Sequence, residues 1–168
     1  MKKKVSTAVF VIFCILIDYL GKIFSVSCQL PLWLDSVGTV LTAYVLGPVS
    51  GAIVGATNNI LYGMQEPVAY IYSITSISIG VLVGIFARRR FFDSIFLTTS
   101  LSVLVTTVTV VISTVLSFVF YNGMTGNIWG DGVIGYMTEK GYSPLLCYIA
   151  GEFYVDFMDK LLSLYFLY

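Results

Sequence analysis

The sequence VSTAVFVIFCILIDYLGKIFSV at residues 5–26 is a nearly unbroken apolar run in which only Asp18 and Lys22 carry charge. A helix needs about 20 such residues to cross the hydrocarbon core, so this run predicts a spanning helix at Val5–Ser25. Lys2–Lys4 precede the run, as they would in a signal peptide. Because the run continues past Asp18 and no A-x-A-like cleavage site follows, we expect the helix to be retained.

The composition of the whole chain is typical of a membrane-embedded protein. Of its 168 residues, 58% are hydrophobic and 11% are charged, and the mean hydropathy is +0.92, whereas about a quarter of a soluble domain is charged. Basic and acidic residues balance at 9 each, so no excess of positive charge points to nucleic acid. The chain has no histidine, and its three cysteines lack metal-type spacing. We therefore expect one domain over residues 1–168, with no metal and no cofactor.

Five further apolar runs follow the first one. Backbone polar groups cannot be left bare in lipid, so each run should be helical. The predicted helices are Leu34–Leu46, Val49–Tyr62, Val68–Ala87, a long helix within Phe91–Tyr121, and Pro144–Leu167. The fold class is thus an all-α integral membrane protein, a bundle of six transmembrane helices. The second and third helices, with about 13 residues each, are short for a span, so they are tilted, begin inside the loops, or form a broken pair.

Two basic runs predict the orientation of the bundle. Basic segments stay in the cytoplasm, and with six helices Lys2–Lys4 and Arg88–Arg90 fall on the same side. Both termini are then cytoplasmic, and the chain is a multi-pass protein of a bacterial cytoplasmic membrane. The two long loops, Ser27–Leu34 and the Gly-rich polar loop Asn122–Ser143, lie outside.

The last predicted helix carries ionisable side chains at membrane depth, where such groups are costly and tend to be functional. Glu152, Asp156 and Asp159 share one helix face, which must look into the bundle or a wet cavity. Asp156 and Lys160 are spaced i, i+4 and could pair. Glu152 lies in the outer half of the membrane, where it either contacts a ligand or pairs structurally. Asp159 and Lys160 lie deeper, and we expect them to hold helices together.

Other polar groups in apolar surroundings have structural interpretations. Asp18 and Lys22 repeat the i, i+4 spacing and could pair. Asp35 begins the second helix, where its carboxylate is expected to cap free amides. Asn58 and Asn59 are adjacent amides in the third helix, and at least one of them must face protein. The Thr and Ser hydroxyls of the fifth helix are interpreted as helix packing.

The outer loops are aromatic and hold both tryptophans, Trp33 and Trp129. Aromatic residues gather at membrane surfaces as belts, but an aromatic pocket with a few polar groups also suits a flat ring ligand. Acidic groups beneath such a pocket favour a cationic or amine-bearing ligand. The candidate substrate-binding residues are Trp33, Asn58, Asn59, Tyr62, Gln65, Tyr70, Trp129, Tyr148, Glu152 and Asp156.

Two further motifs bear on packing and activity. Gly51-x-x-x-Gly55 and Gly80-x-x-x-Gly84 permit close helix contact, either within the chain or with a partner. The chain has no nucleophile elbow, no histidine base, no HExxH motif and no nucleotide-binding loop. It is therefore not expected to be an enzyme, and it could not use ATP for uptake by itself.

The stretch LDSVGT at residues 34–39, followed by LGPVSGAIVG at residues 46–55 and by Asn58 and Asn59, resembles the substrate-binding S components of energy-coupling factor transporters. The resemblance implies six helices that bind one vitamin or related small molecule near the outer face, beneath loop lids. It also implies docking on a membrane coupling protein that carries two ATPase subunits, with ATP hydrolysis toppling the S component so that the ligand opens inward. The expected function is thus high-affinity capture of a vitamin-like ligand.

The sequence also departs from that family. Members often dock through Ala-x-x-x-Ala on the first helix, which this chain lacks, so the Gly51/Gly55 or Gly80/Gly84 pair is the alternative docking surface. The aromatic and acidic character predicts a nitrogenous ring compound, such as a thiamine-like or pyridoxine-like vitamin or precursor. Three other hypotheses remain: a membrane-embedded ligand sensor, a small proton-coupled secondary transporter, and a membrane enzyme.

Overall fold

The computed structural model describes residues 2–120 and 125–168, with side chains from Ser6 onward. The helices of these residues are α1 (Lys2–Ser27), α2 (Val37–Leu46), α3 (Pro48–Gly63), η1 (Pro67–Tyr70), α4 (Ser73–Ala87), η2 (Phe91–Asp93), α5 (Ile95–Phe120), α6 (Ile128–Glu139) and α7 (Pro144–Tyr165). No strand occurs in the described ranges, so the all-α prediction is confirmed. The predicted helix end at Tyr121 and the loop start at Asn122 lie outside the described residues, as do the side chains of Lys2–Lys4.

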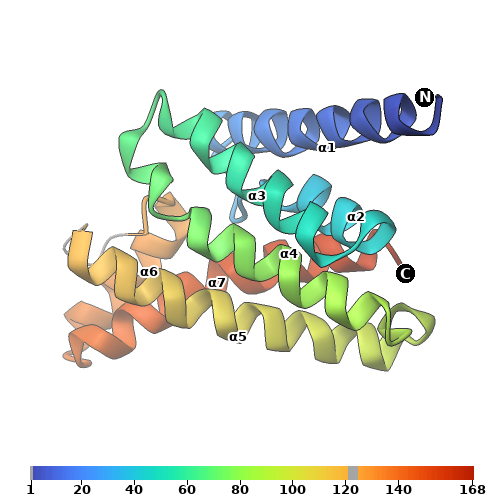
Figure 1. The fold of residues 1–168 in the computed structure, drawn as a ribbon. Helices are drawn as coiled ribbons and strands as arrows, with labels where there is room; N and C mark the ends of the chain where they lie inside the picture. Colours follow the sequence, from blue (N-terminus) through green and yellow to red (C-terminus); the bar gives the residue numbers. More distant parts are fainter. Residues whose placement is uncertain (1, 121–124) are drawn as a thin grey trace.

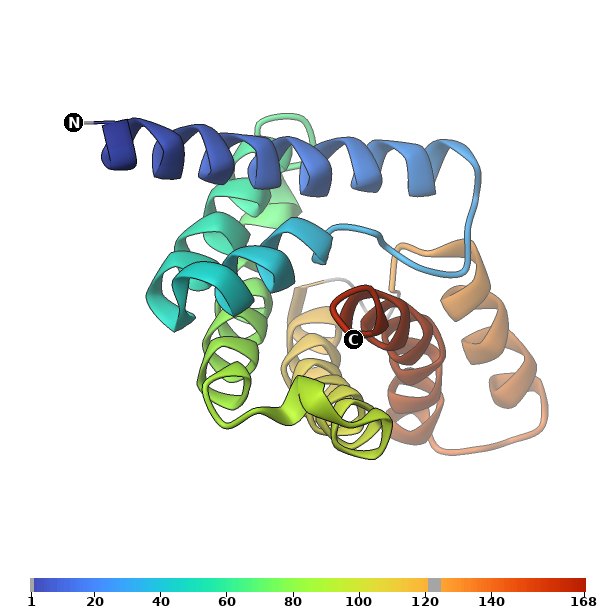
Figure 2. The same ribbon diagram turned by 90° about the vertical axis from the view of Figure 1, so that its right-hand side faces the viewer.

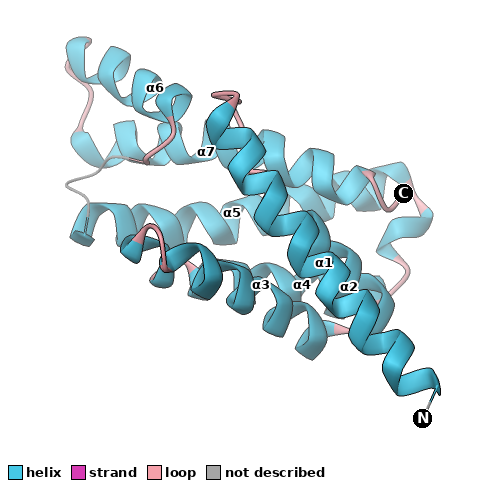
Figure 3. Cartoon of the chain, turned by 90° about the horizontal axis from the view of Figure 1, so that it is seen from above, coloured by secondary structure: helices cyan, strands magenta, loops and turns pink. Residues whose placement is uncertain are grey.

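The long helices run side by side, and the two chain ends lie at the same end of the bundle (Figure 1). The start of α1, the C-terminus and the α4–α5 turn that carries Arg88–Arg90 occupy one end of the bundle. The α3–α4 and α6–α7 connections occupy the opposite end. Seen from above, α1 crosses the other helices obliquely (Figure 3). The basic segments of the sequence thus gather at one end of the molecule.

Among the described residues, three helical stretches are long and apolar enough to cross a membrane: Ser6–Ser27, Pro67–Ala87 and Ile95–Phe120. Their outward faces expose large apolar side chains, among them Val9 at 61% and Val111 at 61%. A continuous surface of this kind is unfavourable in water but suits contact with lipid chains. These helices are those of a membrane protein.

The close contact between α3 and α4 explains both glycine motifs. A Cβ on Gly80 would collide with the backbone of Gly51, and a Cβ on Gly84 would collide with Pro48. A Cβ on Gly55 would meet Ser76. All four glycines are buried. The motifs therefore serve packing within the chain, and the predicted use of either glycine pair as a docking surface for a partner is wrong.

Residues 128–139 form helix α6, although the sequence analysis placed them in a polar loop. The Asn127 side chain caps this helix by accepting a hydrogen bond from the Trp129 backbone N–H at 3.0 Å. Gly130 then packs against the backbone of Gly151 in α7. Gly130 thus permits a close helix contact, whereas a Cβ on Gly132 or Gly135 of the same helix would meet nothing within 4 Å.

The second helix begins at Val37 rather than Leu34, because Leu34 has a left-handed backbone with φ of 55°. Its first turn is capped from α1, where the Asp18 carboxylate accepts hydrogen bonds from Gly38 N at 2.6 Å and Thr39 N at 2.9 Å. The prediction that Asp35 caps this helix is wrong, and so is the pairing of Asp18 with Lys22. The predicted helix Val68–Ala87 is likewise divided into η1 and α4.

The α1–α2 connection turns inward and meets the start of α2 in the middle of the molecule (Figure 2). Irregular backbone at membrane depth has to find protein partners. The Leu34 N–H donates to Asp159 Oδ1 at 2.7 Å, and the Ser25 hydroxyl donates to the Leu32 carbonyl. Gly21 of α1 leaves room for the backbone of Leu34. This inward turn brings residues 33–35 between the helices.

Candidate functional site

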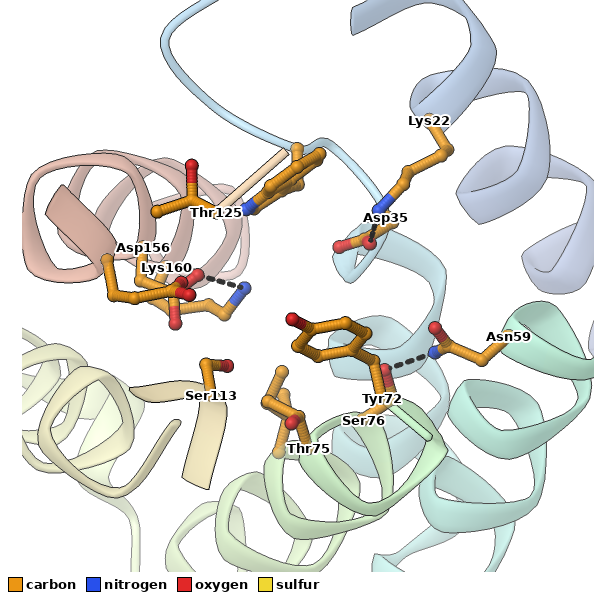
Figure 4. A pocket seen from close by; sticks show the side chains of 13 residues that line it. Lys22, Asp35, Asn59, Tyr72, Thr75, Ser76, Ser113, Thr125, Asp156 and Lys160 are labelled. Carbon is orange, nitrogen blue, oxygen red and sulfur yellow. Dashed lines mark hydrogen bonds and ion pairs between the residues drawn. The ribbon is translucent and has the colours of Figure 1, made fainter. Parts of the chain in front are cut away.

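A cavity of about 70 Å³ lies where the inward-turning connection faces α4, α5 and α7 (Figure 4). Its volume suffices for a few water molecules or a small chemical group. Its lining combines two aromatic rings with hydroxyl, amide and charged groups. The lining residues are Lys22, Trp33, Asp35, Asn59, Tyr72, Thr75, Ser76, Ile79, Ser113, Thr125, Glu152, Asp156 and Lys160.

The first ion pair of the cavity joins α1 to the inward-turning connection. Lys22 Nζ lies 2.8 Å from Asp35 Oδ2 and 4.0 Å from the centre of the Trp33 ring. This ion pair fixes Trp33 over the cavity.

The second ion cluster lies on α7. Lys160 Nζ is 2.6 Å from Asp159 Oδ2 and 3.8 Å from Asp156 Oδ1, so the predicted pairing of Asp156 with Lys160 is confirmed. Asp159 also accepts hydrogen bonds from Leu34 N and from the Ser36 hydroxyl. As predicted, Asp159 holds separate elements together, whereas the two ion pairs of Lys160 lie within α7.

Glu152 is linked to hydroxyl groups rather than to a cation. The Ser117 hydroxyl donates to Glu152 Oε1 at 2.5 Å, and the Tyr72 hydroxyl lies 2.9 Å from the same Ser117 oxygen. No lysine or arginine of the described ranges lies within ion-pair distance of Glu152. The Tyr72 ring projects into the middle of the cavity (Figure 4). This hydroxyl chain couples α5 and α7 to the residue just before α4.

Asn58 and Asn59 are both buried. The sequence predicts that at least one of these two amides faces protein. Asn59 Nδ2 donates to the Ser76 hydroxyl at 2.6 Å and to the Gly55 carbonyl at 3.2 Å. Asn58 Nδ2 donates to the Asp35 carbonyl at 3.4 Å. Asn59 thus lines the cavity. Asn58 does not line it, and its amide is hydrogen-bonded to the backbone of the α1–α2 connection.

Two lining groups keep a buried oxygen without a partner. Asp156 Oδ2 and Thr75 Oγ1 have no hydrogen-bond partner within the part of the chain that the structure describes. Their residues are only 4% and 8% exposed. Since almost all buried polar atoms in proteins are satisfied, these two oxygens are open acceptors.

Of the ten candidate residues, Trp33, Asn59, Glu152 and Asp156 line the cavity. The other six do not. Tyr62 lies behind Lys22, whose Nζ is 5.4 Å from its ring. Three more have partners or positions elsewhere: Gln65 donates to the Tyr19 hydroxyl, Tyr70 packs against Gly63, and Tyr148 is near the Phe118 ring. Trp129 is 49% exposed and donates its indole N–H to the Gln29 carbonyl at 2.7 Å, and Asn58 lies behind the connection.

Several lining residues were not among the ten predicted candidates. Lys22 and Lys160 were recognised as charges at membrane depth, which was a usable signal. Tyr72 was interpreted as part of the aromatic belt at the membrane surface, and Ser113 was interpreted as a hydroxyl that serves helix packing. Nothing in the sequence distinguished Thr75 or its neighbours on α4 from ordinary helix residues.

Comparison with known proteins finds no relative of this chain. No protein-family model, no curated protein and no solved structure matches the chain.

Proposed function

We propose that the chain captures a vitamin or related small nitrogenous ring compound, as the substrate-binding subunit of an energy-coupling factor type importer. The observation that carries the proposal is the buried cavity, in which the Trp33 and Tyr72 rings border Glu152 and Asp156. Membrane helices retain ionisable groups at this depth mainly for a functional reason. Ligand sites characteristically combine apolar walls with a few polar groups that fix orientation.

The proposed orientation has six crossings, made by α1, α2, α3, α4, α5 and α7, with both termini in the cytoplasm. It is supported by the placement of the termini and Arg88–Arg90 at one end of the bundle. The cavity residues Lys22, Tyr72 and Glu152 come from the other half of their helices or from segments beside it. A ligand would then enter from outside, with residues 28–36 as a lid.

The proposed partners are a membrane coupling protein and two ATPase subunits, since the chain has no nucleotide-binding loop of its own. Reconstitution into proteoliposomes with and without such a module tests this role. We expect the chain to copurify with an ATPase pair and to support uptake that needs ATP. A Walker-lysine variant of the ATPases is the control, and it should abolish uptake while leaving ligand binding intact.

A second candidate is a proton-coupled secondary transporter, which the row of Glu152, Asp156 and Asp159 along α7 favours. The same vesicles distinguish the two functions. Uptake that a pH gradient drives in the absence of ATPases would support the second candidate and contradict the first.

A further inference from the structure

The cavity holds more acidic than basic groups. Asp35, Glu152 and Asp156 line it, and Asp159 borders it through Lys160. The lysines of the cavity already have closer partners, because Lys22 is 2.8 Å from Asp35 and Lys160 is 2.6 Å from Asp159. Asp156 is the more distant partner of Lys160 at 3.8 Å, and Glu152 has only a hydroxyl partner. Four carboxyl groups thus share two ammonium groups.

Two acceptor oxygens in this cavity have no donor. Asp156 Oδ2 and Thr75 Oγ1 are unpartnered within the described ranges, and both residues are more than nine-tenths buried. An unpaired buried acceptor destabilises the folded state, so its retention needs a reason. A ligand that brings N–H groups and positive charge would satisfy both oxygens and offset part of the acidic excess.

We infer that the cavity binds a small organic cation, with an ammonium, amidinium or protonated ring nitrogen placed against Asp156 and Thr75. This inference rests on the capture function proposed above and adds the charge class of its ligand. Glu152 adds a second carboxyl group to the lining of the cavity, and the Trp33 and Tyr72 rings provide faces against which a planar cation is attracted.

Tyr72 limits the size of what can enter. Its ring occupies the middle of a cavity of about 70 Å³, which is small for a ring compound (Figure 4). A planar cation therefore enters together with a rotation of the Tyr72 side chain. Ser117 keeps its hydrogen bond to Glu152 when the Tyr72 hydroxyl leaves.

Three planar compounds of nearly equal shape test the charge class: benzamidinium, benzamide and benzoate. The full-length chain in detergent carries Trp129→Phe, so that Trp33 is its one tryptophan and reports on the cavity. We expect benzamidinium to change the Trp33 fluorescence at a concentration at least tenfold lower than benzamide, and benzoate to have no effect. Equal response to all three, preference for benzoate, or no response to any would overturn the inference.

Substitutions at the two open acceptors test the placement of the cation. Thr75→Val and Asp156→Asn should each weaken benzamidinium binding at least tenfold, while Asp93→Asn, in an exposed ion pair with Arg90, should leave it unchanged. Because Thr75 Oγ1 has no partner, Thr75→Val should also leave the unfolding temperature equal or higher. Unchanged affinity in the folded Thr75→Val protein would overturn the placement even if Asp156→Asn fails to fold.

The charge class and the transport role can fail separately. ATP-dependent uptake of a neutral or anionic compound would support the importer function and would contradict the proposal that the ligand is a cation. Selective binding of benzamidinium, without any ATPase partner, would support the cation site and contradict the importer.

Discussion

At the scale of single residues, the two tryptophans have different surroundings. Trp33 lines the cavity, and the Lys22 ammonium lies 4.0 Å from its ring centre. Trp129 is half exposed on α6 and is tied to the Gln29 carbonyl by its indole N–H. A ligand in the cavity would therefore contact the first indole and not the second.

We predict that Trp33→Ala weakens binding of the compound that copurifies with the chain by about 1 kcal/mol or more, because a stacked ring is lost. Trp129→Ala is the matched control and should change the affinity by less than twofold. Isothermal titration calorimetry on the detergent-solubilised variants measures both. A larger loss for Trp129→Ala than for Trp33→Ala would contradict the assigned site.

The sequence could not separate these two residues. Both follow helices at the same end of the predicted bundle, and both are the aromatic type that a membrane surface attracts. What separates them is the left-handed turn at Leu34 and the hydrogen bond from its N–H to Asp159, 125 positions away. Glu152 and Asp156 were predictable, because a charged helix face in lipid has few possible environments.

At the scale of elements, α2 depends on a carboxylate from another helix. Asp18 is fully buried, and it accepts hydrogen bonds from Gly38 N, Thr39 N and the Thr39 hydroxyl. These are the amides that a short helix leaves free in its first turn. Since α2 has only 10 residues, its position rests on this contact with α1.

Asp18→Ala should therefore destabilise the protein by about 2 kcal/mol or more, since buried amides lose a charged partner. Asp93→Ala, which removes an exposed ion pair, should cost less than about 1 kcal/mol. The midpoint of thermal unfolding in detergent reports both changes. Equal midpoints for the two variants would show that Asp18 does not hold α2.

Helices were predicted correctly where a long apolar run defines them, and they were missed or misplaced where contacts with other helices define them. The apolar runs that became α1 and α5 are long enough to define helices by themselves. Helix α6 was missed because glycines favour loops, and the sequence does not show that Gly130 packs against Thr125 and against Gly151 of α7. The start of α2 was misplaced because its cap comes from α1 and not from the neighbouring Asp35.

At the scale of the whole molecule, charge and connections are divided between the two ends. Arg88–Arg90 and both termini lie at one end, and the connections around the cavity lie toward the other. If the basic end is cytoplasmic, a ligand reaches Trp33 and Glu152 from outside. The direction of capture therefore depends on the orientation of the chain.

Cysteine labelling in whole cells tests this orientation. The three native cysteines are first replaced, and one new cysteine is introduced at Ser143 or at Arg89, both of which are exposed. We expect a membrane-impermeant maleimide to label Ser143→Cys in intact cells, and Arg89→Cys only after permeabilisation. The reverse pattern would place the cavity toward the cytoplasm and contradict uptake from outside.

Capture of a small molecule in this cavity is tested most directly by native mass spectrometry of the gently purified chain. We expect one small nitrogenous ring compound per chain on the wild-type protein. Glu152→Gln should lose that compound while keeping its unfolding temperature, because a glutamine oxygen can still accept the hydrogen bond from Ser117. Retention of the same compound by Glu152→Gln, or a wild-type protein that never carries one, would contradict the proposed capture site.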